Sequence, residues 1–165
     1  MLSRLPLVLT AACLAQELPA PKYQQPAPVQ PVPFSHRQHM AAKLECKQCH
    51  EIPDPGDYAG LPKTEVCMAC HVQIRRDSPH IQKLAAYQHD GRKIPWERVY
   101  RVPDYVFFSH KEHVERARVA CQACHGPVRE RDVLHREKDL SMAACMDCHR
   151  ARGASLECTY CHEQR

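Results

Sequence analysis

The sequence predicts a mostly irregular fold with short α-helices, whose core is not made by the protein's own apolar side chains. Two features of the composition lead to this prediction. Of 165 residues, only ten are aromatic (three Phe, six Tyr and one Trp) and 14 are proline, so a conventional core would be difficult to build. In contrast, 11 cysteines and 12 histidines are present, and most of them lie in repeated short motifs. Such motifs are typical of a chain that folds around tightly bound groups.

Five pentapeptides share the pattern Cys-x-x-Cys-His, which is the attachment signature of a c-type haem. The thioether-forming cysteines would be Cys46, Cys49, Cys67, Cys70, Cys121, Cys124, Cys145, Cys148, Cys158 and Cys161. The histidine after each pair would bind the iron as its proximal ligand, which gives His50, His71, His125, His149 and His162. Zinc sites and disulfides are the competing interpretations, but neither requires a histidine after every second cysteine. We therefore expect five covalently attached haem c groups, packed together as the core.

The N-terminus predicts export, as expected of a protein whose haems are attached outside the cytoplasm. An apolar run of about ten residues, Leu5–Leu14, follows Arg4; it is too short to span a membrane but adequate for a signal peptide of residues 1–15. Alternatively, small residues before Cys13 form a lipoprotein processing site, which would leave a lipid anchor. A retained N-terminus is the third possibility. In each case we expect a periplasmic or otherwise extracytoplasmic protein.

Beyond the signal, four segments are predicted. Proline is concentrated in residues 16–33, which we interpret as an extended linker or a disordered leader. A two-haem module (34–93), an extended connector (94–107) and a three-haem module (108–165) follow. Near the end of the first module, Ser78-Pro79 is a helix start and Gly91 a helix stop, and Ile81 and Leu84 share one face of the helix between them.

A repeat identifies further iron ligands. Phe34–His39 and Phe108–His113 both read Phe-Ser-His-basic-Gln/Glu-His, and each Ser is followed three residues later by Gln or Glu, as in a helix capping box. Histidines three residues apart share one helix face, so they cannot bind opposite sides of one iron, but each can cap a different haem. We predict His36, His39, His110 and His113 as distal ligands.

With this repeat ahead of closely spaced attachment motifs, the chain resembles the class III multihaem cytochromes c. The resemblance implies that the second histidine of each repeat caps the nearest following haem and the first caps the next one. His39 would then face His50, and His36 would face His71; likewise His113 would face His125, and His110 would face His149. His135 would cap the haem of His162. His80 and His89 remain as possible replacements.

Residues 32–165 more closely resemble the pentahaem cytochrome subunit of alternative complex III, a bacterial quinol-oxidising assembly. The resemblance rests on Gly60–His71, on the connector Ile94–His110, and on Leu140–His149. It implies electron transfer from a quinol-oxidising membrane complex to a downstream carrier or oxidase. The partners would be redox proteins, including iron–sulfur and quinone-binding membrane subunits, and membrane association would come through them or a lipid anchor. The N-terminal membrane helix usual in that family is not expected here, which favours the alternative of a free periplasmic shuttle serving a hydrogenase, a formate dehydrogenase or an extracellular acceptor.

Coordination decides between an electron carrier and an enzyme. An iron with two imidazole ligands has no open position for a substrate and exchanges single electrons, so we predict an electron-transfer protein rather than a catalyst. Met40 and Met142 are candidates for an exceptional ligand. A small multihaem reductase is less favoured, because it would need an open iron. The formal charge of +4 comes without a basic-aromatic stacking platform, which argues against nucleic acid; the basic side chains form a solvated surface, balance haem propionates, or dock an acidic partner.

Overall fold

The computed structural model describes residues 25–162, and within them the predicted fold class is confirmed. All helices are short: α1 (His36–Ala41), α2 (Cys46–Cys49), α3 (Thr64–His71), α4 (Pro79–His89), the π-helix η1 (Lys111–Arg116), α5 (Cys121–His125), the 3-10 helix η2 (Val128–Glu130), α6 (Met142–Arg152) and the 3-10 helix η3 (Cys158–Tyr160). Pairing of extended chain in this range is limited to an isolated antiparallel bridge between Gln25 and Arg136. No helix between residues 25 and 162 is long and apolar enough to cross a membrane.

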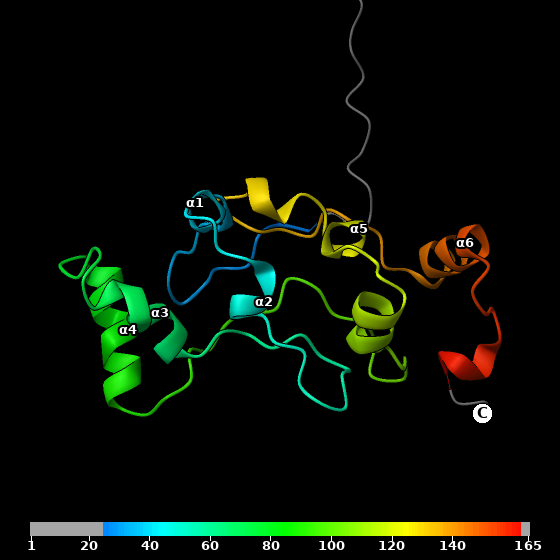
Figure 1. The fold of residues 1–165 in the computed structure, drawn as a ribbon, viewed down its shortest axis with the longest axis horizontal. Helices are drawn as coiled ribbons and strands as arrows, with labels where there is room; N and C mark the ends of the chain where they lie inside the picture. Colours follow the sequence, from blue (N-terminus) through cyan, green and yellow to red (C-terminus); the bar gives the residue numbers. More distant parts are fainter. Residues whose placement is uncertain (1–24, 163–165) are drawn as a thin grey trace, which may run out of the picture.

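The helices follow one another along the long axis of the molecule (Figure 1). Helices α3 and α4 pack together at one end, α1 and α2 come next, α5 and η1 follow, and α6 and η3 lie at the other end. The order in space differs from the order in sequence in two places: α3 and α4 lie outside α1 and α2, and η2, which follows α5 in the chain, lies back against α1.

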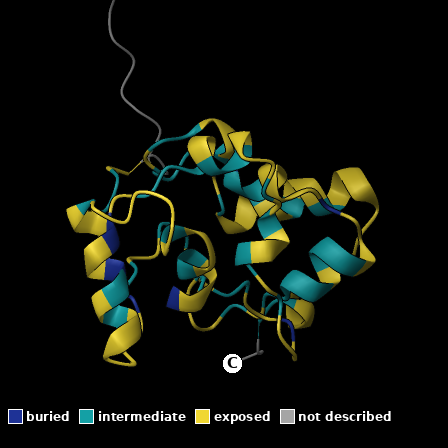
Figure 2. Ribbon diagram, turned by 60° about the vertical axis from the view of Figure 1, so that its left-hand side comes forward, coloured by how far each residue is buried: buried dark blue, intermediate teal, exposed yellow. Residues whose placement is uncertain are grey.

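Burial of apolar side chains is limited and local (Figure 2). Val32, Ile81, Leu84 and Ile94 form one small cluster on the inner face of α4, with Trp96 partly buried against it. No side chain among the described residues is less than 2% exposed. The polypeptide thus supplies a conventional core only around α4, as the composition predicted.

Helix α4 matches its sequence prediction. Ser78 is the N-cap, Pro79 occupies the first turn, and Gly91, with φ +63°, follows the C-cap. Proline suits the first turn because its missing N–H would have no partner there, and glycine accepts a positive φ without strain. Ile81 and Leu84 form the buried face, as expected.

The proline-rich segment differs from its prediction. Residues 25–33 are extended, but they are packed rather than free: Val32 is only 3% exposed and belongs to the α4 cluster. Lys83 Nζ donates to the Pro31 carbonyl (2.8 Å), and the Gln30 side chain forms two hydrogen bonds with the backbone of Glu97 (2.8 and 3.1 Å). The burial of Val32 and these three hydrogen bonds together make this stretch part of the fold. The predicted signal peptide, Cys13 and residues 16–24 of the linker lie outside the described residues.

Residues 94–107, the predicted connector, contain no helix. Trp96 packs against the α4 cluster and lies edge-on to Phe34 (ring centres 6.4 Å apart), so it joins the connector to the start of α1. At its far end, Phe107 N donates to the Cys161 carbonyl (2.8 Å). The connector therefore runs from the α4 end of the molecule to the last attachment motif.

Candidate haem-binding sites

Each Cys-x-x-Cys-His motif lies on a short helical segment: α2, α3, α5, α6 or η3. One helical turn separates the two cysteines, so both thiols point to the same side, where they can bond one edge of a porphyrin. None of the ten motif cysteines is paired in a disulfide, so the structure gives no support to the disulfide alternative. No group of three or more His, Cys, Asp or Glu side chains within residues 25–162 is arranged to hold a metal ion, so the geometry does not support zinc sites.

Four of the proximal histidines face a second imidazole. The ring centres are 6.0–6.4 Å apart in the pairs His36–His50, His39–His71, His110–His125 and His113–His149. A metal–imidazole bond is about 2 Å long, so two imidazoles on opposite sides of one metal ion have ring centres about 6 Å apart. The residues present therefore fit a bis-histidine iron between each pair.

The members of the pairs differ from those implied by the family resemblance. The first histidine of each repeat, His36 or His110, faces the nearest following motif, and the second, His39 or His113, faces the next one. The expected order is thus wrong in both repeats.

Local contacts explain the reversal. The second histidine donates Nδ1–H to the carbonyl four residues earlier, as His39 does to Ser35 (2.7 Å) and His113 to Ser109 (2.8 Å). It also stacks on the phenylalanine that opens the repeat, with ring centres 4.3 Å (Phe34) and 4.5 Å (Phe108) apart. These two contacts fix the orientation of the second histidine ring. The first histidine, which lacks them, faces the attachment motif that follows the repeat in the chain.

The fifth predicted pair, His135 with His162, is not brought together among the described residues. The ring beside His162 is that of Tyr105 (centres 6.0 Å apart), whose carbonyl lies 3.3 Å from His162 Nδ1. The chain next to His135 is held at the third motif and not at the fifth. Two residues after His135, the backbone amide of Glu137 donates to the hydroxyl of Tyr100 (3.0 Å), which contacts His125. His80 and His89, the possible replacements, lie on α4 at the opposite end of the molecule from η3 (Figure 1).

Backbone carbonyls orient most of these imidazoles. Their Nδ1 atoms are bonded to the carbonyls of Gly60 (His50, 2.8 Å), Ile74 (His71, 2.9 Å), Asp57 (His110, 2.8 Å) and Ser155 (His149, 2.6 Å). A hydrogen bond at Nδ1 fixes the tautomer and leaves Nε2 free to bind a metal. The Nδ1 of His36, in contrast, is buried without a hydrogen-bond partner.

Two central histidines are held neutral. Burial lowers the pKa of His36 to about 4, with smaller contributions from His50 and His39. Burial likewise lowers the pKa of His125 to about 4, helped by His110 and His50. Neutral imidazole is the form that binds iron, so both rings are in the correct state at neutral pH.

Attachment thiols of different motifs lie close to one another. Burial raises the pKa of several of these thiols, and in four of them a thiol of another motif raises it further. The neighbours are Cys49 for Cys67, Cys46 for Cys121, Cys148 for Cys124, and both Cys124 and Cys161 for Cys145. These neighbours give the order α3, α2, α5, α6, η3, and Figure 1 shows α3, α2 and α5 in this order along the long axis, with α6 and η3 together at the far end.

Segment 128–137, which follows α5, ties the two predicted modules together. Asp132 accepts a hydrogen bond from Ser35 Oγ (2.6 Å) and pairs with Arg37, and Arg129 pairs with Glu45 (3.0 Å). Within the segment, the Arg131 guanidinium donates two hydrogen bonds to the Glu137 carboxylate (2.7 and 2.8 Å), and this bidentate ion pair fixes the path of the chain.

Tyr100 is a functional residue that the sequence did not reveal. Its hydroxyl donates to the His125 carbonyl (3.1 Å) and accepts from the Glu137 amide, and its ring meets the His125 ring edge-on (centres 4.7 Å apart). The orienting carbonyls of Asp57 and Gly60 were also missed. The sequence does not show which backbone carbonyl will accept a hydrogen bond. The glycines at positions 56 and 60 are the sequence feature that marks this loop.

Short helices, five Cys-x-x-Cys-His motifs and opposed imidazoles define a multihaem c-type cytochrome, a class that transfers electrons through covalently bound haem c. Residues 13–98 match the model of the class III cytochrome c family, and residues 106–164 match that of cytochrome c7 and related cytochromes c. Over 161 residues the chain is 32% identical to the "Menaquinone reductase, multiheme cytochrome c subunit" of Nitratidesulfovibrio vulgaris, with 81% of this chain and 77% of that protein covered. The chain belongs to the class III cytochrome c family.

Proposed function

We propose that this cytochrome carries five haem c groups and relays electrons through them without a catalytic site of its own. The observation that carries the proposal is the set of four imidazole pairs with ring centres 6.0–6.4 Å apart. Numbered by their proximal histidines in chain order, haems I to IV would each be bis-histidine, attached at His50, His71, His125 and His149. Haem V would be attached at His162.

The relay follows a single line of haems, II–I–III–IV–V. This order is supported by the neighbouring thiols of successive motifs, since motifs whose thiols lie near one another would place the edges of their porphyrins close together. Haem II, at α3, and haem V, at η3, are then the two ends at which electrons enter and leave.

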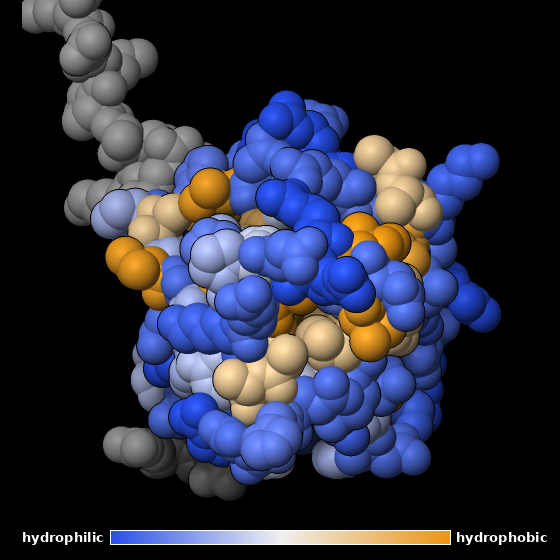
Figure 3. Space-filling model, turned by 90° about the vertical axis from the view of Figure 1, so that its left-hand side faces the viewer, coloured by the Kyte–Doolittle hydropathy of each residue, from blue (hydrophilic) through white to orange (hydrophobic). Residues whose placement is uncertain are grey.

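The end of the molecule formed by α3 and α4 has a polar surface, which suits contact with water or with a polar partner protein. Figure 3 shows this face covered largely by hydrophilic side chains, with apolar ones in separate small patches. In this region, Arg75 and Arg76 lie on exposed chain between the two helices. A face of this kind favours docking to a protein over insertion into a lipid bilayer.

We further propose that the protein works outside the cytoplasm as a subunit of a membrane complex that exchanges electrons with a quinone. The name of the Nitratidesulfovibrio relative, menaquinone reductase, supports a quinone-linked role and adds a direction, toward the quinone, opposite to that implied by the alternative complex III resemblance. Iron–sulfur and quinone-binding subunits would be the partners. The second candidate is a free periplasmic shuttle.

Two measurements test the proposal. Mass spectrometry of the denatured holoprotein is expected to show five haem adducts, and four or fewer would contradict the pentahaem assignment. Gentle detergent extraction of native membranes, followed by identification of co-migrating proteins, is expected to recover the cytochrome with quinone-binding subunits. Recovery solely as a free protein in the periplasmic fraction would contradict complex membership and favour the shuttle.

A further inference from the structure

The loop of residues 51–60, between α2 and α3, is closed on itself. Its two ends meet where Gly60 N donates to the Glu51 carbonyl (2.7 Å). The chain therefore leaves α2, makes a compact excursion and returns to its starting point, as in an Ω-loop. We call it the 51–60 loop.

Two carbonyls of the 51–60 loop orient histidines on two different irons. The Gly60 carbonyl accepts from Nδ1 of His50, the proximal ligand proposed for haem I (2.8 Å). The Asp57 carbonyl accepts from Nδ1 of His110, the distal ligand proposed for haem III (2.8 Å). These two haems are neighbours at the centre of the line, where the two-haem and three-haem modules meet.

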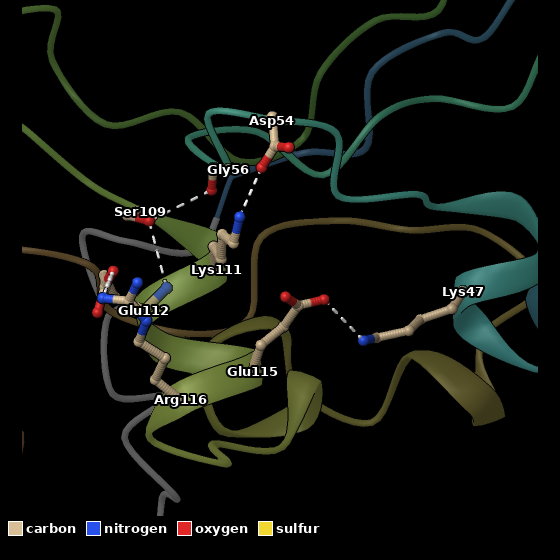
Figure 4. Close-up of polar contacts among 8 residues, drawn as sticks. All are labelled: Lys47, Asp54, Gly56, Ser109, Lys111, Glu112, Glu115 and Arg116. Carbon is tan, nitrogen blue, oxygen red and sulfur yellow. Dashed lines mark hydrogen bonds and ion pairs between the residues drawn. The ribbon is translucent and has the colours of Figure 1, made fainter.

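The 51–60 loop is also fastened to the helix that carries the second of these histidines (Figure 4). Gly56 O accepts from Lys111 N (3.0 Å) and Ser109 Oγ (3.4 Å), and Lys111 Nζ pairs with Asp54 (2.5 Å). A separate ion pair, Lys47–Glu115 (3.1 Å), joins α2 to the same helix without involving the loop.

Glycine is required at position 56 for two reasons. Its φ of +101° is one that other residues rarely adopt. A Cβ added there would also lie 2.4 Å from Cβ of Lys111, so either the loop or η1 would have to move. Adding one methyl group at position 56 is therefore expected to disturb the contact between the loop and Lys111, the residue that follows His110.

The four imidazole pairs fall into two geometries. Where an axial histidine is held by the 51–60 loop, the two planes are nearly parallel, 9° in His36–His50 and 10° in His110–His125. Where the distal histidine bonds its own helix, the planes are crossed, 61° in His39–His71 and 41° in His113–His149.

We propose that the 51–60 loop is a shared positioning element for haems I and III, which holds their axial imidazoles nearly parallel and tunes both reduction potentials together. A carbonyl that accepts from Nδ1 makes the imidazole a stronger donor to the iron, which stabilises the oxidised state and lowers the potential. Loosening the loop is then expected to raise the potentials of the two central haems and leave those of haems II and IV unchanged. The proposal rests on the ligation given under the proposed function.

The test uses electron paramagnetic resonance and a redox titration of the oxidised holoprotein. Parallel and crossed imidazole planes give distinguishable low-spin ferric signals, so the two geometries can be followed separately. In Gly56→Ala we expect at least one parallel-type signal to change toward the crossed type, with a rise in the matching potential. Asp54→Asn, which removes the ion pair to Lys111 and leaves Gly56 in place, is expected to give a smaller shift of the same signals.

Glu115→Gln is the matched control, because it also replaces a carboxylate that pairs with a lysine across this interface but lies outside the loop. Its spectrum and potentials are expected to equal those of the unmodified protein. Equal shifts in Asp54→Asn and Glu115→Gln would overturn the proposal, as would unchanged signals in Gly56→Ala with five haems attached. Should Gly56→Ala fail to mature, unchanged signals in Asp54→Asn would overturn it.

His110→Met separates this proposal from the proposed function. It is expected to replace one parallel-type signal by that of a histidine–methionine haem, which identifies haem III. If His110→Met left every signal unchanged, the ligation itself would be wrong. If it changed one signal while the loop variants changed none, the relay would stand and the positioning role would fail.

Discussion

At the scale of single residues, the two histidines of each repeat are not equivalent. His39 and His113 are fixed by a carbonyl of their own helix and by a stacked phenylalanine, whereas His36 and His110 depend on what the rest of the fold brings to them. The spacing His-x-x-His indicates that both residues can serve as ligands. Which iron each one serves depends on the path of the chain after the helix, and sequence spacing does not contain that path.

Replacing His113 by Met is expected to raise the potential of haem IV, the haem attached at His149. Methionine is a weaker donor than imidazole and stabilises the reduced iron, while the thioether bonds at Cys145 and Cys148 do not involve the sixth ligand. A redox titration should show one potential raised, and mass spectrometry should still show five haems. If the haem attached at His125 responded instead, the reversed order of pairing derived from the ring geometry would be refuted.

His135→Ala tests the remaining predicted ligand. Since the structure does not bring His135 to His162, we expect the spectra of all the haems to stay unchanged in this variant. The visible and electron paramagnetic resonance spectra of the oxidised protein provide the measurement. Appearance of a high-spin component assigned to haem V would restore His135 as its distal ligand.

At the scale of elements, the sequence was informative where local rules dominate. Helix α4 has the boundaries that Ser78-Pro79 and Gly91 predict, and Ser35 caps α1 by accepting from Gln38 N (3.1 Å). In the second repeat, Ser109 Oγ likewise accepts from Glu112 N (3.2 Å), but the chain continues as a π-helix, in which Ala117 N donates to the Glu112 carbonyl five residues earlier (2.8 Å). Its contacts with the 51–60 loop are long-range, and a local capping pattern cannot foresee them.

The packed course of residues 25–33 could not be predicted for a similar reason. Proline content alone indicates extended chain, and the structure agrees with that. Whether extended chain is free or packed depends on a few apolar contacts, here those of Val32 with Ile81 and Leu84.

Segment 128–137 gives a prediction for pH dependence. The hydrogen bonds from Arg131 hold the pKa of the Glu137 carboxyl below its ordinary value of 4.5, and the Glu137 side chain is only 16% exposed. The unfolded state then takes up this proton at a higher pH than the folded state does. The contribution to stability is therefore complete above about pH 4.5 and is lost as the pH falls through the folded pKa.

Comparison with Glu137→Gln isolates this contribution. Below pH 4.5 the free energy of unfolding of the unmodified holoprotein is expected to fall more steeply than that of the variant, and the two curves should converge at the acid end. Denaturant unfolding at a series of pH values provides the measurement. Parallel curves across the whole range would mean that the Arg131–Glu137 contact does not stabilise the fold through its charge.

At the scale of the whole molecule, the small α4 cluster and the line of attachment motifs have one physical origin. A chain with ten aromatic residues in 165 cannot bury enough apolar surface by itself, so most of its short helices are expected to be spaced along bound haems, and the closest helix packing within residues 25–162 is that of α3 with α4 and of α1 with η2. The connector runs from the α4 cluster to the last attachment motif, and segment 128–137 joins α1 to the third motif. The motif neighbours given by the thiols follow one another in a single series.

A single line of haems predicts that a change at haem I affects transfer between the two ends. In His36→Met, haem I would have a raised potential and would retain electrons that arrive from haem II, because about 59 mV of one-electron potential corresponds to a factor of ten in the equilibrium constant. A photoreductant attached to a cysteine introduced at the exposed His89 on α4 would deliver electrons next to haem II. We expect the appearance of electrons on haems III to V to be slower in His36→Met, by up to about tenfold for each 59 mV, and His113→Met to leave the arrival at haem III unchanged. Equal rates in the unmodified protein and His36→Met would show that electrons bypass haem I, so that the haems form a branched network and not a line.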